Sequence, residues 1–357
     1  SSSRRLAAAT MGNALPAEER PMVTDPQNHL PDVEACKVAV IGAGAFGTAM
    51  ATVAARNGHE VCLYARDPDQ VASINEQRRN NKAMSEFEIP ENVYATTSVE
   101  EACEGAAFVI VALPAQRTPD FLKKYRHCIA PQVPLCITGK GLYLPTRKLL
   151  GDAIRDAMER DQCLAYLSGP SFAKEIMDMQ PTAVVVACTN LSKAEFIQRV
   201  LSSLWFRVYT STDVVGVQLG GALKNPLAIG AGMIEGKGKG FNTMAAYVTK
   251  AQLELQKLTI AMGGEPTTVS GLSGVGDLML TAFGSLSRNR TTGVRLARGD
   301  LLDDILKDMT VEGVPTAAVA VHFADQHGLE LPIFRTVAAI LDRSLPLDQA
   351  HLALMGR

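Results

Sequence analysis

The feature that most constrains the fold of this 357-residue chain is a glycine-rich segment placed directly after a short apolar run. Residues 37–41, Lys-Val-Ala-Val-Ile, predict a buried parallel strand because they are apolar and β-branched. An alanine-rich stretch over residues 48–56 predicts a helix, and residues 59–64 predict a second strand. Between the first strand and the helix lies a GxGxxG motif, which consists of Gly42, Ala43, Gly44, Ala45, Phe46 and Gly47. This order predicts a βαβ unit of the dinucleotide-binding, or Rossmann, type.

Each glycine of the motif has its own physical role in holding a pyrophosphate. Gly42 permits the tight turn, Gly44 lets backbone N–H groups approach the phosphates, and Gly47 lets the helix pack closely on the strand. The N-terminus of the helix adds a partial positive charge that favours an anion. We therefore expect NAD or NADP as the cofactor.

The residues after the second strand bear on the choice between these two cofactors. Asp67 follows the last motif glycine by 20 residues, the spacing at which an acidic residue binds the adenosine ribose. However, Asp67-Pro68 better predicts an N-cap with proline in the first turn of a helix that runs to Asn80. Arg66 is then the candidate on the ribose side, where a guanidinium tolerates or favours a 2′-phosphate. The choice between NAD and NADP stays open.

The alternation of strands and helices continues beyond this unit, with further strands predicted over residues 107–113, 135–138, 163–167 and 182–188. Ligands of open parallel sheets bind beyond the carboxyl ends of the strands. Pro114, Lys140 and the loop 168–173 lie at such ends, and the loop contains Gly169, Ser171 and Ala173. Lys140 stands between two glycines, which is unusual for a surface lysine, although a solvated turn lysine would give the same pattern.

From about residue 212 the strand pattern stops. Residues 213–235 predict a long helix that is apolar on nearly all sides and therefore buried, with Lys224 in its middle. Burial lowers the pKa of a lysine and equips it for proton transfer, whereas a lysine that extends its ammonium to the surface would have no such role. Pro226 predicts a kink or a break in this helix.

Further polar residues in the second half suggest a site for a phosphorylated substrate. Asp277 lies near the N-terminus of a helix that residues 271–278 open, where the helix dipole alone could explain it. Arg288 lies in the sequence Ser287-Arg288-Asn289-Arg290, which is either a phosphate clamp or a solvated helix face. Glu312 is a candidate acid at a helix start. Because no histidine lies in these loops or in the buried helix, acid–base chemistry by histidine is disfavoured and lysine chemistry is favoured.

Composition excludes several classes of protein. The 35 Lys and Arg against 37 Asp and Glu give a net charge of −2, without the basic excess of a nucleic-acid or anionic-membrane binder. No apolar run approaches the ~18 residues of a membrane span. The seven cysteines are scattered without a CxxC pair, so we expect reduced thiols and no disulfide scaffold, structural zinc site or other metal.

The predicted fold class is α/β, with an N-terminal Rossmann-type parallel sheet followed by an all-α C-terminal domain. We expect a disordered or targeting segment over residues 1–34, a dinucleotide-binding domain over 35–211 and a helical substrate domain over 212–357. The first segment is rich in Ser, Arg and Ala and has its first acidic residue at Glu18, as in an organelle transit segment. A plastid or other organelle is therefore expected, with a cytoplasmic protein as the alternative.

Six short motifs, taken together and in order, resemble the NAD(P)-dependent glycerol-3-phosphate dehydrogenase family from about Cys36 to Met355. They are residues 42–47, 140–142, 167–173, 220–225, 274–278 and 287–290. The detail of residues 64–67, 89–93 and 293–296 is closer to the bacterial and plastid type than to the animal cytosolic type. Departures from the family pattern are Pro226 and a slightly shortened approach to Glu312.

The resemblance implies reduction of dihydroxyacetone phosphate to sn-glycerol 3-phosphate by hydride from NAD(P)H, and a homodimer. It implies that Lys224 is the proton donor and acceptor, with Lys140 and Asp277 as the other catalytic residues. Substrate-binding positions implied by it are Lys140, Gly169, Ser171, Asn225, Asp277, Ser287, Arg288 and Asn289. Cofactor positions outside the glycine motif are Arg66, Pro114, Lys140, Ala173, Arg288 and Glu312.

Two alternatives belong to other classes. A β-hydroxyacid dehydrogenase of the 6-phosphogluconate type also has a catalytic lysine, but there the lysine and an asparagine are a helical turn apart, whereas Lys224 and Asn225 are adjacent. A non-catalytic nucleotide-sensing module would leave Lys224 and Arg288 without a role.

Overall fold

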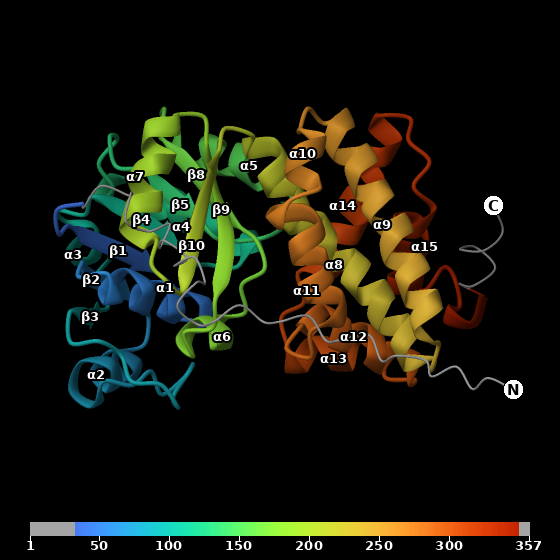
Figure 1. Ribbon diagram of the computed structural model, residues 1–357, viewed down its shortest axis with the longest axis horizontal. Coiled ribbons are helices and arrows are strands. Elements are labelled where there is room, and N and C mark those ends of the chain that lie inside the picture. The colour runs from blue at the N-terminus through green and yellow to red at the C-terminus, as the bar shows by residue number, and fades with distance from the viewer. Residues whose placement is uncertain (1–32, 350–357) are drawn as a thin grey trace, which may run out of the picture. The chain divides into compact units, whose positions relative to one another are not determined.

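The computed structural model describes residues 33–349. The expectation of a targeting segment over residues 1–34 therefore lies almost entirely outside the described residues. The first half contains an eight-stranded sheet in the order β10-β9-β8-β5-β4-β1-β2-β3 (Figure 1). Its strands are β1 (Lys37–Ile41), β2 (Glu60–Tyr64), β3 (Val93–Thr96), β4 (Phe108–Val111), β5 (Leu135–Ile137), β8 (Leu164–Ser168), β9 (Thr182–Cys188) and β10 (Phe206–Ser211).

The sheet is covered on both faces, as its apolar strands require. Along β1, Val38 and Val40 belong to one core, whereas Ala39 and Ile41 belong to the other. The first core includes α1 (Ala45–Arg56) and α7 (Leu191–Leu201), and the second includes α3 (Val99–Cys103), α4 (Thr118–Tyr125) and α5 (Leu150–Met158). The predicted Rossmann-type sheet is confirmed.

The sheet is mostly but not wholly parallel, because β9 runs antiparallel to β8. The connection between them contains only the five-residue helix α6 (Ala173–Met177), too short to form the usual helical crossover, so the chain turns back on itself. A longer helix, α7, separates β9 from β10, and these two strands are again parallel. The sequence pattern did not single out the strands β3 and β10 at the two edges of the sheet.

The second half is helical, and its centre is α8 (Val214–Gly236). It packs against α9 (Phe241–Ala261), α11 (Asp277–Phe283), α12 (Arg288–Ala297) and α14 (Gly313–Gln326), which lie around it in Figure 1. The remaining elements are α10 (Pro266–Val269), a π-helical turn (Leu272–Gly276), α13 (Leu302–Asp308), α15 (Pro332–Leu341) and a 3₁₀ turn (Leu347–Gln349). The predicted helical second half is thus confirmed.

Two predicted details of the helices are wrong. A break at Pro226 is absent, because α8 is one helix whose residues 219–233 are all buried by neighbours that hold the chain in place, whereas the alternative of a kink stays a prediction. The helix after Asp67 does not reach Asn80, because α2 (Pro68–Gln77) ends at Arg78, which has a left-handed backbone with φ 54°. Asp67 itself caps α2 as predicted, accepting from the N–H of Asp69 at 2.9 Å.

Within residues 33–349, no single helix has the length and apolar character needed to cross a bilayer. One bent pair of segments, Pro266–Phe283 with Arg288–Ala297, meets the criteria of length and composition only when taken together.

Candidate active site

The glycine-rich turn after β1 has the shape that a pyrophosphate requires. Gly42 has φ +111° and donates its N–H to the carbonyl of Tyr64 at 3.1 Å, so a side chain there would be strained. A Cβ on Gly47 would lie 1.8 Å from the Gly42 oxygen, which makes this close packing of α1 possible only for glycine. A Cβ on Gly44 would meet nothing within 4 Å, and no side chain caps the first turn of α1. The open turn and the uncapped N–H groups fit an anionic dinucleotide.

Two buried side-chain amides that were not predicted from the sequence hold this turn in place. The Gln70 and Asn80 side chains each donate to the carbonyl of Ala43, at 2.7 and 3.0 Å, and Gln70 also donates to Asn80 at 2.8 Å. Asn80 further donates to the Thr48 hydroxyl at 2.7 Å. No local motif indicates these contacts, because they join α2 and the segment after it to the start of α1.

Arg66 follows the carboxyl end of β2 and is exposed. Within residues 33–349 its guanidinium makes no hydrogen bond or ion pair. Asp67, by contrast, caps α2 and forms an ion pair with Lys82. The arginine is therefore the group at this strand end that is available to a ligand.

The main cluster of buried charge consists of one carboxylate and two lysines from distant parts of the chain. Asp277, 1% exposed at the start of α11, accepts from Lys224 through Oδ1 at 2.5 Å and from Lys140 through Oδ2 at 2.7 Å. Lys224 comes from the middle of α8, and Lys140 from the loop after β5. The structure thus brings together the three residues predicted to be catalytic.

Each lysine has further partners. Lys224 donates to the hydroxyl of Thr281 at 2.6 Å, and no motif in the sequence marks this threonine, which comes from a helix 57 positions further along the chain. Lys140 donates to the carbonyl of Gly169 at 2.8 Å and to the hydroxyl of Ser171 at 3.4 Å. The loop after β8 therefore reaches the lysine cluster, as its place at a strand end predicted.

Burial determines the electrostatics of this cluster. Lys224 is 7% exposed, and burial lowers its pKa to about 8, with Asp277 opposing the shift and Lys140 adding to it. Two ammonium groups share a single carboxylate, so the protonated cluster carries a net positive charge. Such a charge suits a carbonyl oxygen that becomes negative during reduction.

Two side-chain amides connect the cluster to the helices behind it. Asn225 donates to the carbonyl of Lys140 at 3.1 Å, and Asn289 donates to the Asn225 amide oxygen at 3.0 Å. The Asn289 oxygen in turn accepts from the N–H of Gly313 at 3.0 Å. Each amide keeps hydrogen-bonding capacity beyond these contacts.

The residues of the predicted phosphate clamp differ in their partners: Ser287 and Arg290 are bonded within the protein, whereas Arg288 is not. Ser287 is the N-cap of α12 and accepts from the N–H of Arg290 at 3.1 Å, while Arg290 forms an ion pair with Glu235. Arg288 is exposed, and its guanidinium has no hydrogen bond or ion pair with any described residue. Arg288 is therefore the free cation of this segment.

Glu312 lies against the turns that follow β4 and β5. A Cβ on Gly141 would lie 2.8 Å from the Ala115 side chain and 3.1 Å from Oε2 of Glu312. This oxygen is buried without a hydrogen-bond partner among the described residues, and burial raises the pKa of Glu312. Glu312 lies at the N-cap position of α14, as expected of an acid at a helix start, but its side chain makes no capping hydrogen bond. An unsatisfied buried oxygen beside the Pro114–Ala115 turn is a position where a ligand could bond.

An open glycine turn at the carboxyl edge of a doubly covered sheet, joined to a helical half that supplies buried charged groups, is the architecture of an NAD(P)-dependent oxidoreductase. The N-terminal family model of NAD-dependent glycerol-3-phosphate dehydrogenase matches residues 37–194, and its C-terminal family model matches residues 213–351. The chain belongs to the NAD-dependent glycerol-3-phosphate dehydrogenase family. The predicted family, its NAD(P) cofactor and its dehydrogenase activity are confirmed.

Individual relatives agree with the family assignment. The chain is 44% identical over 325 residues to a chloroplastic glycerol-3-phosphate dehydrogenase [NAD(+)] of Arabidopsis thaliana, covering 90% of this chain and 77% of the relative. It is 40% identical to a glycerol-3-phosphate dehydrogenase [NAD(P)+] of Brucella canis, covering 90% and 97%. The crystal structure of glycerol-3-phosphate dehydrogenase from Coxiella burnetii superposes with a TM-score of 0.85 at 30% identity, covering 90% and 99%.

Proposed function

We propose that the Lys140–Asp277–Lys224 cluster is the catalytic centre at which dihydroxyacetone phosphate is reduced to sn-glycerol 3-phosphate. The observation that carries this proposal is the sharing of one buried carboxylate by two lysines, one from each half of the chain. A bound NAD(P)H supplies the hydride that adds to the carbonyl carbon. The side chains of this protein supply the proton, stabilise the developing charge and bind the phosphate.

In this mechanism Lys224 supplies the proton. Reduction leaves negative charge on the former carbonyl oxygen, and the Lys224 ammonium gives that oxygen a proton from Nζ. A pKa of about 8 suits the task, because the group is largely protonated near neutral pH and still releases its proton readily. Asp277 and Thr281 hold the ammonium in position. In the oxidative direction the neutral amine of Lys224 accepts the proton instead.

Lys140 and Arg288 have electrostatic roles. Lys140, with its side chain 19% exposed, lies on the more open side of the cluster and stabilises charge on the substrate oxygen. Arg288, with Ser287 and the two amides Asn225 and Asn289 nearby in the fold, receives the substrate phosphate. Gly169 and Ser171 position Lys140 through the contacts that they make with its ammonium.

Cofactor binding falls to the turns at the carboxyl edge of the sheet. The turn of residues 42–47 receives the pyrophosphate, and Arg66 lies on the ribose side. Pro114, Ala173 and Glu312 line the remaining part of the dinucleotide site. The unpartnered oxygen of Glu312 is the observation that supports its inclusion.

The assignment is tested by replacing the proposed phosphate ligand and comparing two ketones. Wild-type protein should oxidise NADH far faster with dihydroxyacetone phosphate than with dihydroxyacetone. Arg288→Ala should raise the KM for the phosphorylated ketone and leave the slow rate with dihydroxyacetone unchanged. Arg298→Ala, in which another arginine just past α12 is removed, is the matched control. An Arg288→Ala protein that still prefers the phosphorylated ketone to the wild-type extent would refute the clamp.

Assembly and location are further proposals. We propose a homodimer from the family resemblance, to be tested by light scattering coupled to size exclusion.

We propose an organelle location, plastid above all, supported by the Ser-, Arg- and Ala-rich start and by the chloroplastic name of the Arabidopsis relative. Residues 1–34 fused to a fluorescent protein should then direct it to the organelle, and diffuse cytoplasmic fluorescence would argue against it. The domain division at residues 211 and 212 is kept as a proposal, to be tested by limited proteolysis.

A further inference from the structure

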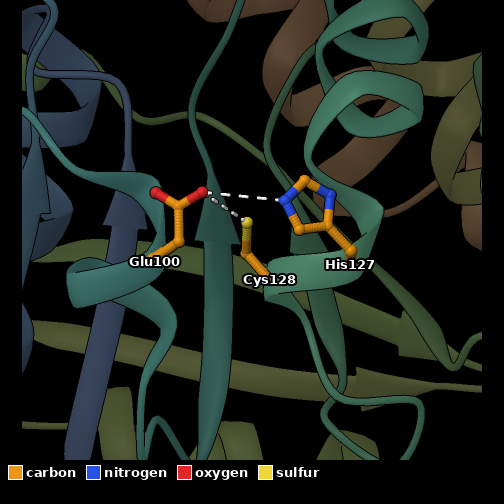
Figure 2. A group of neighbouring side chains, drawn as sticks. All are labelled: Glu100, His127 and Cys128. Carbon is orange, nitrogen blue, oxygen red and sulfur yellow. Dashed lines mark hydrogen bonds and ion pairs between the residues drawn. The ribbon is translucent and has the colours of Figure 1, made fainter.

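Three metal-ligating side chains converge outside the proposed catalytic centre (Figure 2). Glu100 comes from the first turn of α3, and His127 and Cys128 come from the single turn that follows α4. Figure 2 shows the carboxylate of Glu100 directed toward both other side chains. Cys128 donates from Sγ to Oε1 of Glu100 at 3.2 Å, and Nε2 of His127 lies 3.7 Å from the same oxygen.

The separations between these atoms are close to those of ligands on one tetrahedral ion. One oxygen, one nitrogen and one sulfur all lie within 4.8 Å of one another. Bond lengths of about 2.0–2.3 Å around tetrahedral zinc place two ligand atoms about 3.3–3.8 Å apart. The sulfur–oxygen separation of 3.2 Å lies just below this range, and the nitrogen–oxygen separation of 3.7 Å lies within it. The third separation, between sulfur and nitrogen, is at most 4.8 Å, so a cation requires an adjustment there of at most about 1.3 Å.

The surroundings of Glu100 orient its carboxylate in advance. The Ser98 hydroxyl donates to Oε2 of Glu100 at 3.1 Å and also caps α3 by accepting from the N–H of Glu101 at 3.1 Å. With Oε2 held in this way, Oε1 is the oxygen that faces His127 and Cys128. Such an outer contact is typical of carboxylates that bind metals.

Access and anchoring also suit an ion taken up from solvent. The side chains of His127 and Glu100 are 68% and 60% exposed, which leaves room for water at a fourth position. Cys128 is half-buried and packs against the core beneath α3 and α4, which fixes one ligand firmly.

We propose that Glu100, His127 and Cys128 form a binding site for a borderline divalent cation such as Zn²⁺, bound through Oε1, Nε2 and Sγ with water as the fourth ligand. A carboxylate and a thiolate neutralise the charge of the ion, and the imidazole adds a neutral donor. The bound ion joins α3 to the end of α4 and so stabilises this part of the first half. No ligand motif marks this site in the sequence, because 26 residues separate Glu100 from His127.

The test is cation binding by the reduced full-length chain, measured by titration calorimetry with Zn²⁺ and by absorption with Co²⁺. Wild-type protein should bind one equivalent that Glu100→Gln, His127→Gln and Cys128→Ser each lose. The thiolate-to-cobalt absorption band should disappear in Cys128→Ser. His327→Gln, which removes an exposed histidine elsewhere, is the matched control and should keep the full stoichiometry. Ser98→Ala should weaken binding by about ten- to hundredfold while the three ligands remain.

Two outcomes would overturn the proposal. One is the absence of a stoichiometric equivalent in the wild-type protein. The other is unchanged stoichiometry and cobalt absorption in Cys128→Ser, which would place the ion at another of the seven cysteines. Circular dichroism of each variant distinguishes a lost ligand from a lost fold.

Discussion

Removing the shared carboxylate should move the pH profile of the enzyme in a direction that the structure determines. Burial already lowers the pKa of Lys224 to about 8, and Asp277 is the main group that opposes this shift. In Asp277→Asn the buried ammonium loses its partner at 2.5 Å, while repulsion from Lys140 remains. An opposite charge at this range is worth about 1–3 pKa units, so the pKa of Lys224 should fall by that amount.

The sign of the effect differs between the two directions of the reaction. Reduction of dihydroxyacetone phosphate needs protonated Lys224, so in the wild-type protein kcat should fall as the pH rises through about 8. Oxidation of glycerol 3-phosphate needs the neutral amine and should increase through the same pH. In Asp277→Asn both inflections should move to lower pH.

The size of the loss follows from the protonated fraction. With a pKa of about 8, roughly 75% of Lys224 is protonated at pH 7.5, whereas a pKa lowered by about 2 units leaves roughly 3%. The reductive kcat of Asp277→Asn should therefore be about 25-fold lower at pH 7.5 and should recover as the pH is lowered toward 5. Recovery at low pH is the part of the result that a mere loss of structure would not produce.

The assay is the initial rate of NADH oxidation from pH 5 to 9, with glycerol 3-phosphate oxidation measured over the same range. Asp156→Asn, which breaks the exposed Lys148–Asp156 pair at 2.6 Å, is the matched control and should leave both profiles unchanged. NADH binding and the melting curve show whether Asp277→Asn is folded, since breaking a buried ion pair costs about 3–5 kcal/mol. A folded Asp277→Asn protein with unshifted inflections would refute the proposed proton transfer by Lys224.

Three further predictions concern single side chains. Lys224→Ala should lower kcat by about 10²-fold or more with NADH affinity retained in a fluorescence titration, and near-normal turnover would remove Lys224 from the mechanism. Gly44→Ala should leave the melting temperature unchanged, because its Cβ meets open space, yet should weaken NADH binding; Gly58→Ala, at a distant turn, should not weaken it. Arg66→Ala should lower the ratio of kcat/KM for NADPH to that for NADH, and an unchanged ratio would exclude contact with a 2′-phosphate.

Local sequence patterns were sufficient to predict the elements whose conformation depends on residues nearby in the chain. The β1–turn–α1 unit was predicted from its own residues because the left-handed φ of Gly42 and the close approach of Gly47 to the Gly42 oxygen are local constraints. The burial of Lys224 was predicted from the apolar residues on all sides of its own helix. Asp67 was correctly predicted to cap α2, since its partner Asp69 is two residues away.

Features that depend on distant segments were missed or predicted wrongly. The reversal of direction from β8 to β9 depends on a connection too short for a helical crossover, which an apolar run alone does not reveal. The continuity of α8 through Pro226 depends on the helices that surround it, which outweigh the lost hydrogen bond. Neither Thr281 nor Asn80 carried a motif that could have marked it.

The family, the dinucleotide turn and the residue types available for chemistry could be predicted from the sequence, because each depends on residues that are close together in the chain. Tertiary structure alone decided that the ammonium groups of Lys140 and Lys224 meet on Asp277, three residues from segments more than fifty positions apart in the chain. It also decided which arginine near α12 is free and which is paired. The physical reason is that a shared carboxylate and a lowered pKa arise from burial and distance in space, and these exist only when the two halves have packed.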